Sequence, residues 1–290
     1  MKRSIELLRQ LRHVLGGLIV LAAFSMWWKG CFDTPLLAAP PSDGTEDLKA
    51  PPVTPDMLAR GKTLFDTSCA ACHGAKGKAD GEAAYLLVPK PRDLTRGNYR
   101  LISSEYGVVR VEDLFLTITR GMPGSSMPPW AQYKEEDRWA LAHYVKSLGP
   151  KGEEPPKILQ PGPEPARNEN SLAQGRQLFL LACAACHGAS GRGDGQQKQF
   201  DELNYPTKPR DLTRGIFKGS AESHDLYCRI RAGMPGSPMP AALQLSNEDT
   251  WFLVHFIQSL SGPGAETRNR QVLRTLVAKK AAEPLPEDPS

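Results

Sequence analysis

The 290-residue chain carries a formal net charge of +4, and its length allows two compact domains. The charge is unevenly placed: residues 1–30 contain five basic residues and one acidic residue, which accounts for the whole excess, so the rest of the chain is neutral. No basic stripe with interleaved aromatic residues is present. Nucleic acid is therefore excluded as a partner.

Residues 1–32 are typical of a signal peptide or a membrane anchor. Basic residues precede an apolar run at 14–28, and this order places the N-terminus in the cytoplasm and the remainder across the membrane. The run is short for a spanning helix, and a cleavage-type sequence follows at Ala39. However, Trp27 and Trp28 beside Lys29 favour an uncleaved anchor at the membrane interface. We expect an anchored, exported protein, with cleavage near Ala39 as the alternative.

The next segments are a spacer and a helical domain. Residues 33–54 are rich in proline and predict a semi-rigid spacer. Within 55–149, apolar residues at three- and four-residue spacing predict helices at 57–65, 113–119 and 135–148, with Thr54 as the first N-cap. The intervening stretches are rich in Gly, Pro and Asp and predict loops without strands.

Residues 150–168 contain six prolines and predict a second spacer, after which 169–262 repeats the pattern of 55–149. Helices are predicted at 172–181, 225–231 and 247–260, with Ser171 available as an N-cap. Five sequence blocks recur in the same order, which indicates a duplicated domain. We call 55–149 the first repeat and 169–262 the second repeat. The tail, 263–290, contains one candidate amphipathic helix around 272–281.

Each repeat contains Cys-Ala-Ala-Cys-His, the motif for covalent haem attachment, in which two thiols add to the porphyrin and the histidine binds the iron. The predicted thiols are Cys69, Cys72, Cys183 and Cys186, and the predicted iron ligands are His73 and His187. A redox dithiol or half of a zinc site would share Cys-x-x-Cys. The first needs a strand-to-helix context, and the second needs cysteine pairs about 15–20 residues apart. Both are disfavoured here, and we predict two haem c groups.

A second axial ligand is available in each repeat. The loops at 121–128 and 233–240 both read Gly-Met-Pro-Gly-Ser-x-Met-Pro. A lone methionine usually packs in a core, but a methionine loop repeated downstream of a haem motif favours iron ligation, which raises the reduction potential. Met127 and Met239 are preferred because each lies in a Met-Pro pair before the last helix, and Met122 and Met234 are the alternatives.

With these motifs each repeat resembles a class I c-type cytochrome domain, and the chain resembles bacterial, exported diheme cytochromes. The resemblance also rests on Gly61, Gly175, Phe65 and Phe179 of the first helices and on Tyr144 and Phe256 of the last helices. It implies an all-α fold of two tandem domains joined by a proline-rich linker, after an N-terminal hydrophobic signal or anchor helix. In each domain the first and last helices should cross at the glycine.

The resemblance further implies that a proline carbonyl accepts the ring N–H of the iron-binding histidine. The candidates are Pro91 and Pro209, with Pro89 a rival in the first repeat. Arg92 and Arg210 follow and are expected to pair with haem propionates. The repeats differ where Pro129-Trp130 of the first corresponds to two alanines in the second. We therefore expect a more exposed second haem edge and two different potentials.

The function expected is electron transfer by an electron carrier, not catalysis. Single electrons would pass between a membrane respiratory complex and a periplasmic redox partner, on the periplasmic side of a bacterial inner membrane. The alternative is a diheme enzyme of the peroxidase or thiosulfate-oxidising type, with Cys228 or His224 near an unusual haem. Complete methionine loops in both repeats count against it, and Cys228 is expected to be a buried thiol. His143 and His255 are expected to pack or face solvent.

Overall fold

The computed structural model describes residues 48–151 and 155–262. The predicted signal or anchor segment, most of the first spacer and the C-terminal tail lie outside these described residues. Within the described part of the chain, no helix has the length and apolar character needed to cross a membrane.

The first repeat is built of helices and short helical turns. Its elements are α2 (Pro55–Ser68), α3 (Ala70–His73), the 3-10 turns η2 (Ala84–Leu86), η3 (Leu94–Arg96) and η4 (Glu105–Gly107), then α4 (Val111–Arg120) and α5 (Glu135–Leu148). The three predicted helices are present. The Thr54 side chain accepts a hydrogen bond from the Met57 N–H, which confirms it as the N-cap of α2.

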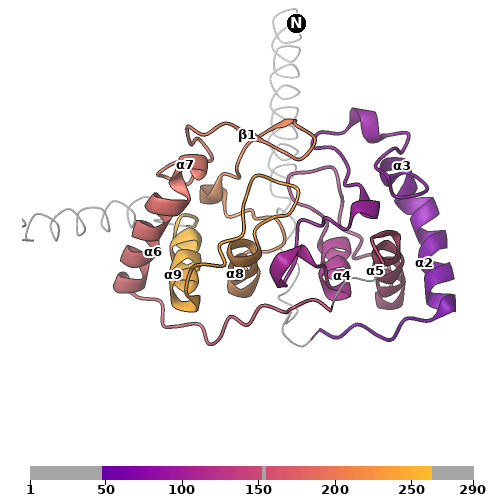
Figure 1. The fold of residues 1–290 in the computed structure, drawn as a ribbon, viewed down its shortest axis with the longest axis horizontal. Coiled ribbons are helices and arrows are strands. Elements are labelled where there is room, and N and C mark those ends of the chain that lie inside the picture. The colour runs from indigo at the N-terminus through magenta and orange to yellow at the C-terminus, as the bar shows by residue number, and fades with distance from the viewer. Residues whose placement is uncertain (1–47, 152–154, 263–290) are drawn as a thin grey trace, which may run out of the picture. The chain divides into compact units, whose positions relative to one another are not determined.

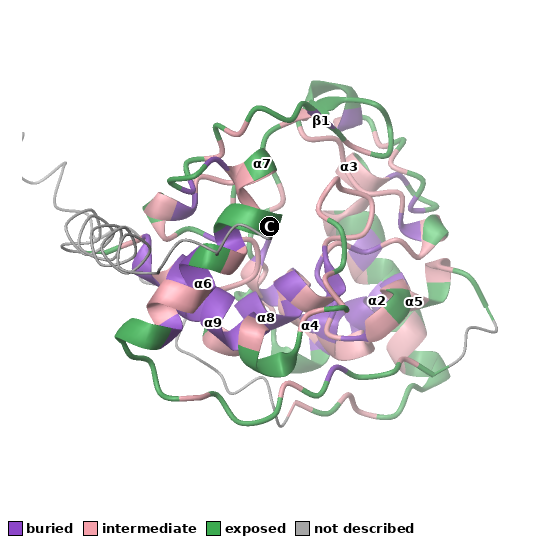
Figure 2. Ribbon diagram, turned by 60° about the vertical axis from the view of Figure 1, so that its left-hand side comes forward, coloured by how far each residue is buried: buried purple, intermediate pink, exposed green. Residues whose placement is uncertain are grey.

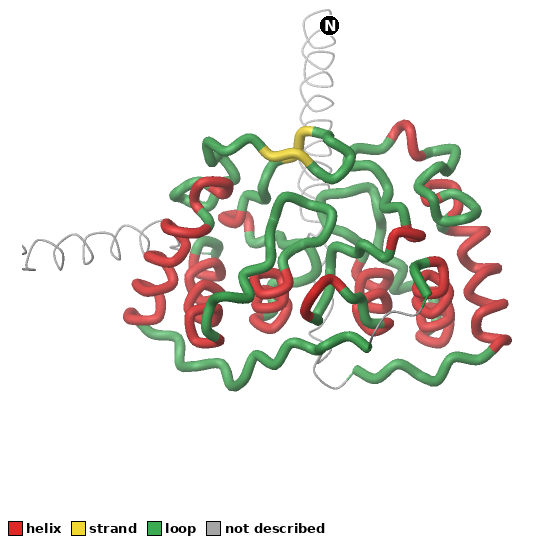
Figure 3. The backbone as a smooth tube through the Cα atoms, in the orientation of Figure 1, coloured by secondary structure: helices red, strands yellow, loops and turns green. Residues whose placement is uncertain are grey.

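The second repeat has the same helical order. Its elements are α6 (Glu169–Ala182), α7 (Ala184–His187), β1 (Gln199–Phe200), β2 (Pro206–Thr207), the 3-10 turn η5 (Leu212–Arg214), α8 (Ser223–Ala232) and α9 (Asn247–Ser259). Figure 3 shows how much of both repeats is loop. The expectation of no strands is wrong in detail, because β1 and β2 form an antiparallel pair. Two residues per strand are too few to show alternation.

The N-cap predicted for the first helix of the second repeat is also wrong. The cap is Asn168, whose side chain accepts from the Ser171 N–H, while the Asn168 N–H donates to the Ser171 hydroxyl. Ser171 is thus the partner within a capping box rather than the cap itself. Both residues are good capping types, and only the backbone distinguishes their roles.

The first and last helices of each repeat cross at a glycine, as the resemblance implied. Helix α2 lies against α5, and α6 lies against α9 (Figure 1). A Cβ on Gly61 would overlap the Ala140 carbonyl oxygen, and one on Gly175 would overlap that of Phe252. Aromatic pairs flank both crossings, with ring centroids 5.3 Å apart for Phe65 and Tyr144 and 5.2 Å for their equivalents Phe179 and Phe256. Only glycine permits this backbone approach.

Each repeat has its own apolar core, and the buried residues gather mainly in the helices (Figure 2). Phe115 stacks on Trp139 in the first core, and Tyr227 packs on Trp251 in the second. Cys228, however, projects from α8 of the second repeat and packs in the core of the first, at 1% exposure. The two repeats therefore share a packed boundary.

The linker is packed rather than a free spacer. Leu159 is 4% exposed and belongs to the first core, and its N–H donates to the Ser103 carbonyl oxygen at 3.0 Å. Further on, the Trp251 indole N–H donates to the Pro161 carbonyl oxygen. The proline-rich composition predicted stiffness, but these contacts attach the linker to both repeats.

Candidate haem sites

The two Cys-x-x-Cys-His segments have the same local structure. Cys69 ends α2 and begins α3 at φ −116° and ψ −31°, and Cys183 has the same angles between α6 and α7. The histidine N–H donates to the first cysteine's carbonyl oxygen at 2.9 Å in both repeats. One helical turn therefore holds both thiols and the imidazole, and the kink before it sets their direction.

The first thiol of each pair is unsuited to dithiol redox chemistry. Burial, with a smaller effect of the neighbouring cysteine, raises the pKa of Cys69 to about 11 and that of Cys183 to about 11. Redox-active cysteines instead have lowered pKa values that favour the thiolate. This agrees with covalent attachment of a cofactor and not with a thioredoxin-like site.

The imidazole of His73 is held for metal ligation. Its Nδ1 lies 3.0 Å from the Arg92 carbonyl oxygen, which can only accept, so Nδ1 carries the proton and the Nε2 lone pair is free to bind. Burial lowers the pKa of His73, and the hydrogen bond from the ring to Arg92 opposes this more weakly. The acceptor predicted from sequence, Pro91, is one residue off, because successive carbonyls in this irregular segment point in different directions.

His187 differs from His73 in this detail. Burial lowers the pKa of His187, and the Arg210 carbonyl acts against it more weakly. Yet the buried Nδ1 of His187 makes no hydrogen bond of ordinary geometry in the described part of the chain. The carbonyl oxygen of Pro209, the predicted acceptor, therefore accepts no hydrogen bond from this ring nitrogen. The two histidines therefore have the same backbone setting and different hydrogen bonding.

The methionine loops are closed identically. The Met122 N–H donates to the Met127 carbonyl oxygen at 3.0 Å, and Met234 donates to Met239 at the same distance. Gly121, at φ 68°, lies so close to the Pro128–Pro129 peptide that a Cβ would stand 2.6 Å from it. Each loop thus presents two methionine side chains from one rigid turn. In the first repeat both methionines line the cavity described next.

A cavity of about 1250 Å³, its mouth included, lies between these groups in the first repeat. Cys69, Cys72 and His73 line it, and so do Met122 and Met127. Its walls are mainly apolar, and the charged side chains on it are all basic: Lys90, Arg92, Arg100 and Lys218. No Asp or Glu of the described residues contributes. An apolar, anionic group therefore fits this cavity, as haem with its two propionates does.

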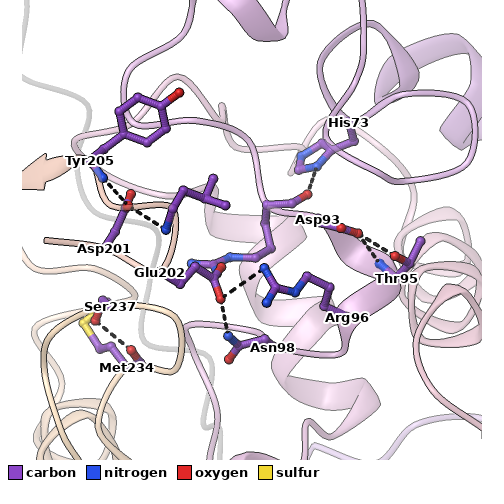
Figure 4. Close-up of polar contacts among 12 residues, drawn as sticks. His73, Asp93, Thr95, Arg96, Asn98, Asp201, Glu202, Tyr205, Met234 and Ser237 are labelled. Atoms are coloured by element: carbon purple, nitrogen blue, oxygen red, sulfur yellow. Dashed lines mark hydrogen bonds and ion pairs between the residues drawn. The ribbon is translucent and has the colours of Figure 1, made fainter.

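The predicted arginines face the boundary between the repeats. Arg92 lines the cavity and pairs with Glu202 of the second repeat. Glu202 also accepts a hydrogen bond from Asn98 at 2.6 Å (Figure 4). Arg210 donates to the Pro123 carbonyl in the methionine loop of the first repeat. Sequence reasoning missed Arg100 and Lys218. The sequence does show that the two basic residues are equivalent, because each lies three residues after the glycine that ends the repeated Pro-Arg-Asp-Leu-Thr-Arg-Gly block.

The remaining histidines and Cys228 pack, as expected. The His143 Nε2 lies 3.0 Å from the Pro51 carbonyl oxygen. The buried His255 contacts the Ser171 hydroxyl through Nδ1 and the Glu164 carboxylate through Nε2. Cys228 is buried 3.9 Å from the His224 ring nitrogen, and neither residue lines the first cavity.

Two helical repeats, each with a Cys-x-x-Cys-His turn and a methionine loop on a glycine-crossed helix pair, define a c-type cytochrome with two haem-binding domains. The chain belongs to the cytochrome c family, whose model matches residues 58–149 and 172–261. Its cofactors are accordingly two covalently bound haem c groups.

Known proteins resemble the chain over most of its length. A cytochrome bc1 complex cytochrome c subunit of Mycobacterium leprae is 28% identical, over 70% of this chain and 62% of the relative. The cbb3-type cytochrome c oxidase subunit FixP of Azorhizobium caulinodans is 26% identical, over 72% of this chain and 62% of the relative. The chain thus spans less than two thirds of these curated relatives. A chain of the Kuenenia stuttgartiensis reducing HAO-like protein complex is 34% identical with a TM-score of 0.68, covering 74% of this chain and all of that one.

Proposed function

We propose that this protein carries single electrons through two haem c groups, between a membrane respiratory complex and a periplasmic redox partner. The observation that supports this best is the duplication of a complete set: attachment cysteines, a histidine and a methionine loop in each repeat. The relatives in the bc1 and cbb3 complexes are cytochrome c subunits, which is consistent with an electron carrier.

In each domain the residues have distinct roles. Cys69 with Cys72, and Cys183 with Cys186, would hold the haems through thioethers, and the bound haem supplies the one-electron redox change. His73 and His187 would bind the iron. Met127 and Met239 are proposed as the second ligands, with Met122 and Met234 as alternatives. The apolar walls would exclude water, and the basic residues would neutralise the propionates.

Optical spectroscopy tests the proposal against the enzymatic alternative. A carrier with two six-coordinate haems gives low-spin spectra for both and binds no carbon monoxide after reduction. High-spin signal from half of the haem, or carbon monoxide binding at one site, contradicts the proposal and favours a diheme enzyme.

The axial methionines are assigned by single exchanges to histidine at positions 122, 127, 234 and 239. Loss of a methionine ligand removes its weak near-infrared charge-transfer band and lowers that haem's potential. We expect this at 127 and 239, with 122 and 234 as matched controls in the same loops. The reverse result assigns the alternatives.

The proposal also includes an anchor in residues 1–32, domains at 55–149 and 169–262, and a body on the periplasmic side of the membrane. Cell fractionation with a C-terminal tag tests it. We expect the haem protein in the membrane fraction, released by detergent and not by salt. Recovery from the periplasm with a new N-terminus near Ala39 establishes cleavage instead.

A further inference from the structure

The cavity of the first repeat is not built from the first repeat alone. Lys218, which follows η5 in the second repeat, lines it beside Arg92 and Arg100. Arg100 occupies in the first repeat the position that Lys218 occupies in the second. The duplicated sequence thus places two equivalent cations at one cavity.

The boundary between the repeats fixes this arrangement. Arg229 of α8 donates to the carbonyl oxygens of Arg100 at 3.0 Å and of Ile102 at 2.6 Å. The Arg120 guanidinium lies 2.6 Å from the Asp225 carboxylate, and both side chains are nearly buried. These contacts adjoin Arg100 on one side and the 218–219 segment on the other, where Gly219 approaches the Leu101 side chain. Lys218 is therefore held at the cavity by packed structure.

Among the described residues, Lys218 has no acidic neighbour, whereas Arg92 and Arg100 lie near Glu202 and Asp201. No hydrogen bond or ion pair joins the Lys218 ammonium to any residue that the structure describes, although the side chain is half-buried. Burial first, then Arg210 and Arg100, lower the pKa of Lys218 to about 8. A half-buried cation among other cations is unfavourable unless an anion lies between them. The cavity itself is where that anion would lie.

We propose that Lys218 of the second repeat, together with Arg100, binds a carboxylate of the haem held in the first repeat, so that both domains complete the first haem site. This inference rests on the proposed function and goes beyond it, because the two haem sites would be neither independent nor separable. The first haem's potential then depends on a side chain of the second domain.

Substitution of Lys218 by Gln in the full-length, two-haem protein tests this. A nearby positive charge favours the reduced haem, so its removal lowers the midpoint of the first haem. We expect the ratio of reduced to oxidised first haem at a fixed potential to fall about threefold to tenfold, where tenfold corresponds to 59 mV for one electron. K218R keeps the charge, so its first-haem midpoint should stay close to that of the unmodified protein.

K208Q is the matched control, because it removes the same charge from an exposed position of the second repeat that does not line the cavity. The first haem's midpoint is identified in C183A/C186A, which retains that haem only. If that variant does not fold, M239H or M234H serves instead, because whichever replaces the ligand of the second haem shifts the midpoint of that haem and leaves that of the first.

The decisive result is the first haem's midpoint. If K218Q moves it no further than K208Q does, or moves the second midpoint alone, the inference is wrong and Lys218 serves its own domain. Failure of the proposed function would be recognised separately, by high-spin or carbon-monoxide-binding haem in the unmodified protein.

Discussion

At the residue scale, identical motifs acquire different surroundings. His73 has an acceptor 3.0 Å from Nδ1 and the equivalent His187 has none of ordinary geometry. Trp130 lines the first cavity and stacks on Tyr133, whereas the equivalent Ala242 packs against the second core. Since hydrogen bonding to the proximal ligand and solvent exposure both tune haem iron, two distinct midpoints are expected. A redox titration that fits a single midpoint would argue against this.

Trp130→Ala tests the contribution of the aromatic side chain. Removing the indole admits water to the first haem edge, and water stabilises the more charged ferric form. The first midpoint should fall while the second stays unchanged, as measured by optical redox titration. Trp130→Phe, which keeps an aromatic ring there, is the control and should shift it less. An unchanged first midpoint in Trp130→Ala would remove this explanation of the asymmetry.

Cys228 should be unreactive in the folded protein. Burial, the largest effect, raises its pKa to about 12, so roughly one thiol in ten thousand is ionised at pH 8. In a Cys31→Ser background, which removes the other cysteine outside the haem motifs, we expect no alkylation by iodoacetamide at pH 8 until denaturant is added. Reactivity should rise with pH toward 10 and above. Rapid labelling of the native protein at pH 8 would show that the boundary between the repeats opens readily.

At the element scale, periodicity and motif spacing made most of the fold predictable. The helices, the glycine crossings and the loops that close each site follow from local pattern and from the repeat. Errors arose where neighbours compete locally, as with Asn168 and Ser171 for a cap or Pro91 and Arg92 for a hydrogen bond. Leu159 and Lys218 were missed because their burial depends on segments far away in the chain.

The helix crossings should tolerate no side chain. In Gly61→Ala and Gly175→Ala the new Cβ overlaps a carbonyl oxygen of the partner helix, and it meets the Tyr144 Cβ at 2.8 Å in the first case and the Phe256 Cβ at 3.0 Å in the second. Overpacking of this kind costs about 1–3 kcal/mol, so the melting temperature should fall by several degrees. Gly149→Ala, where a Cβ makes only ordinary contacts, is the control in thermal unfolding followed by circular dichroism. Equal melting temperatures for Gly61→Ala and Gly149→Ala would mean that the two helices can move apart at the crossing without loss of stability.

At the scale of the whole described chain, the repeats behave as one packed unit rather than two tethered carriers. Cys228 fills the first core, the linker attaches to both repeats, and Arg92 and Arg210 each extend from one repeat to the methionine loop of the other, at Gly236 and Gly124. Equivalent residues thus make reciprocal contacts.

Arg229→Ala should uncouple the repeats. Its guanidinium satisfies two backbone carbonyls of the first repeat, and a hydrogen bond from a charged donor contributes about 1.5–3 kcal/mol. Calorimetry of the wild-type holoprotein should give one cooperative transition, because the shared boundary melts with both cores. Arg229→Ala should separate it into two, with the haem spectra unchanged at low temperature because Arg229 does not line the first cavity. The control is Arg192→Ala, which removes an exposed guanidinium of the same repeat and should leave one transition. If Arg229→Ala also unfolds in a single transition, the boundary is held chiefly by its apolar contacts.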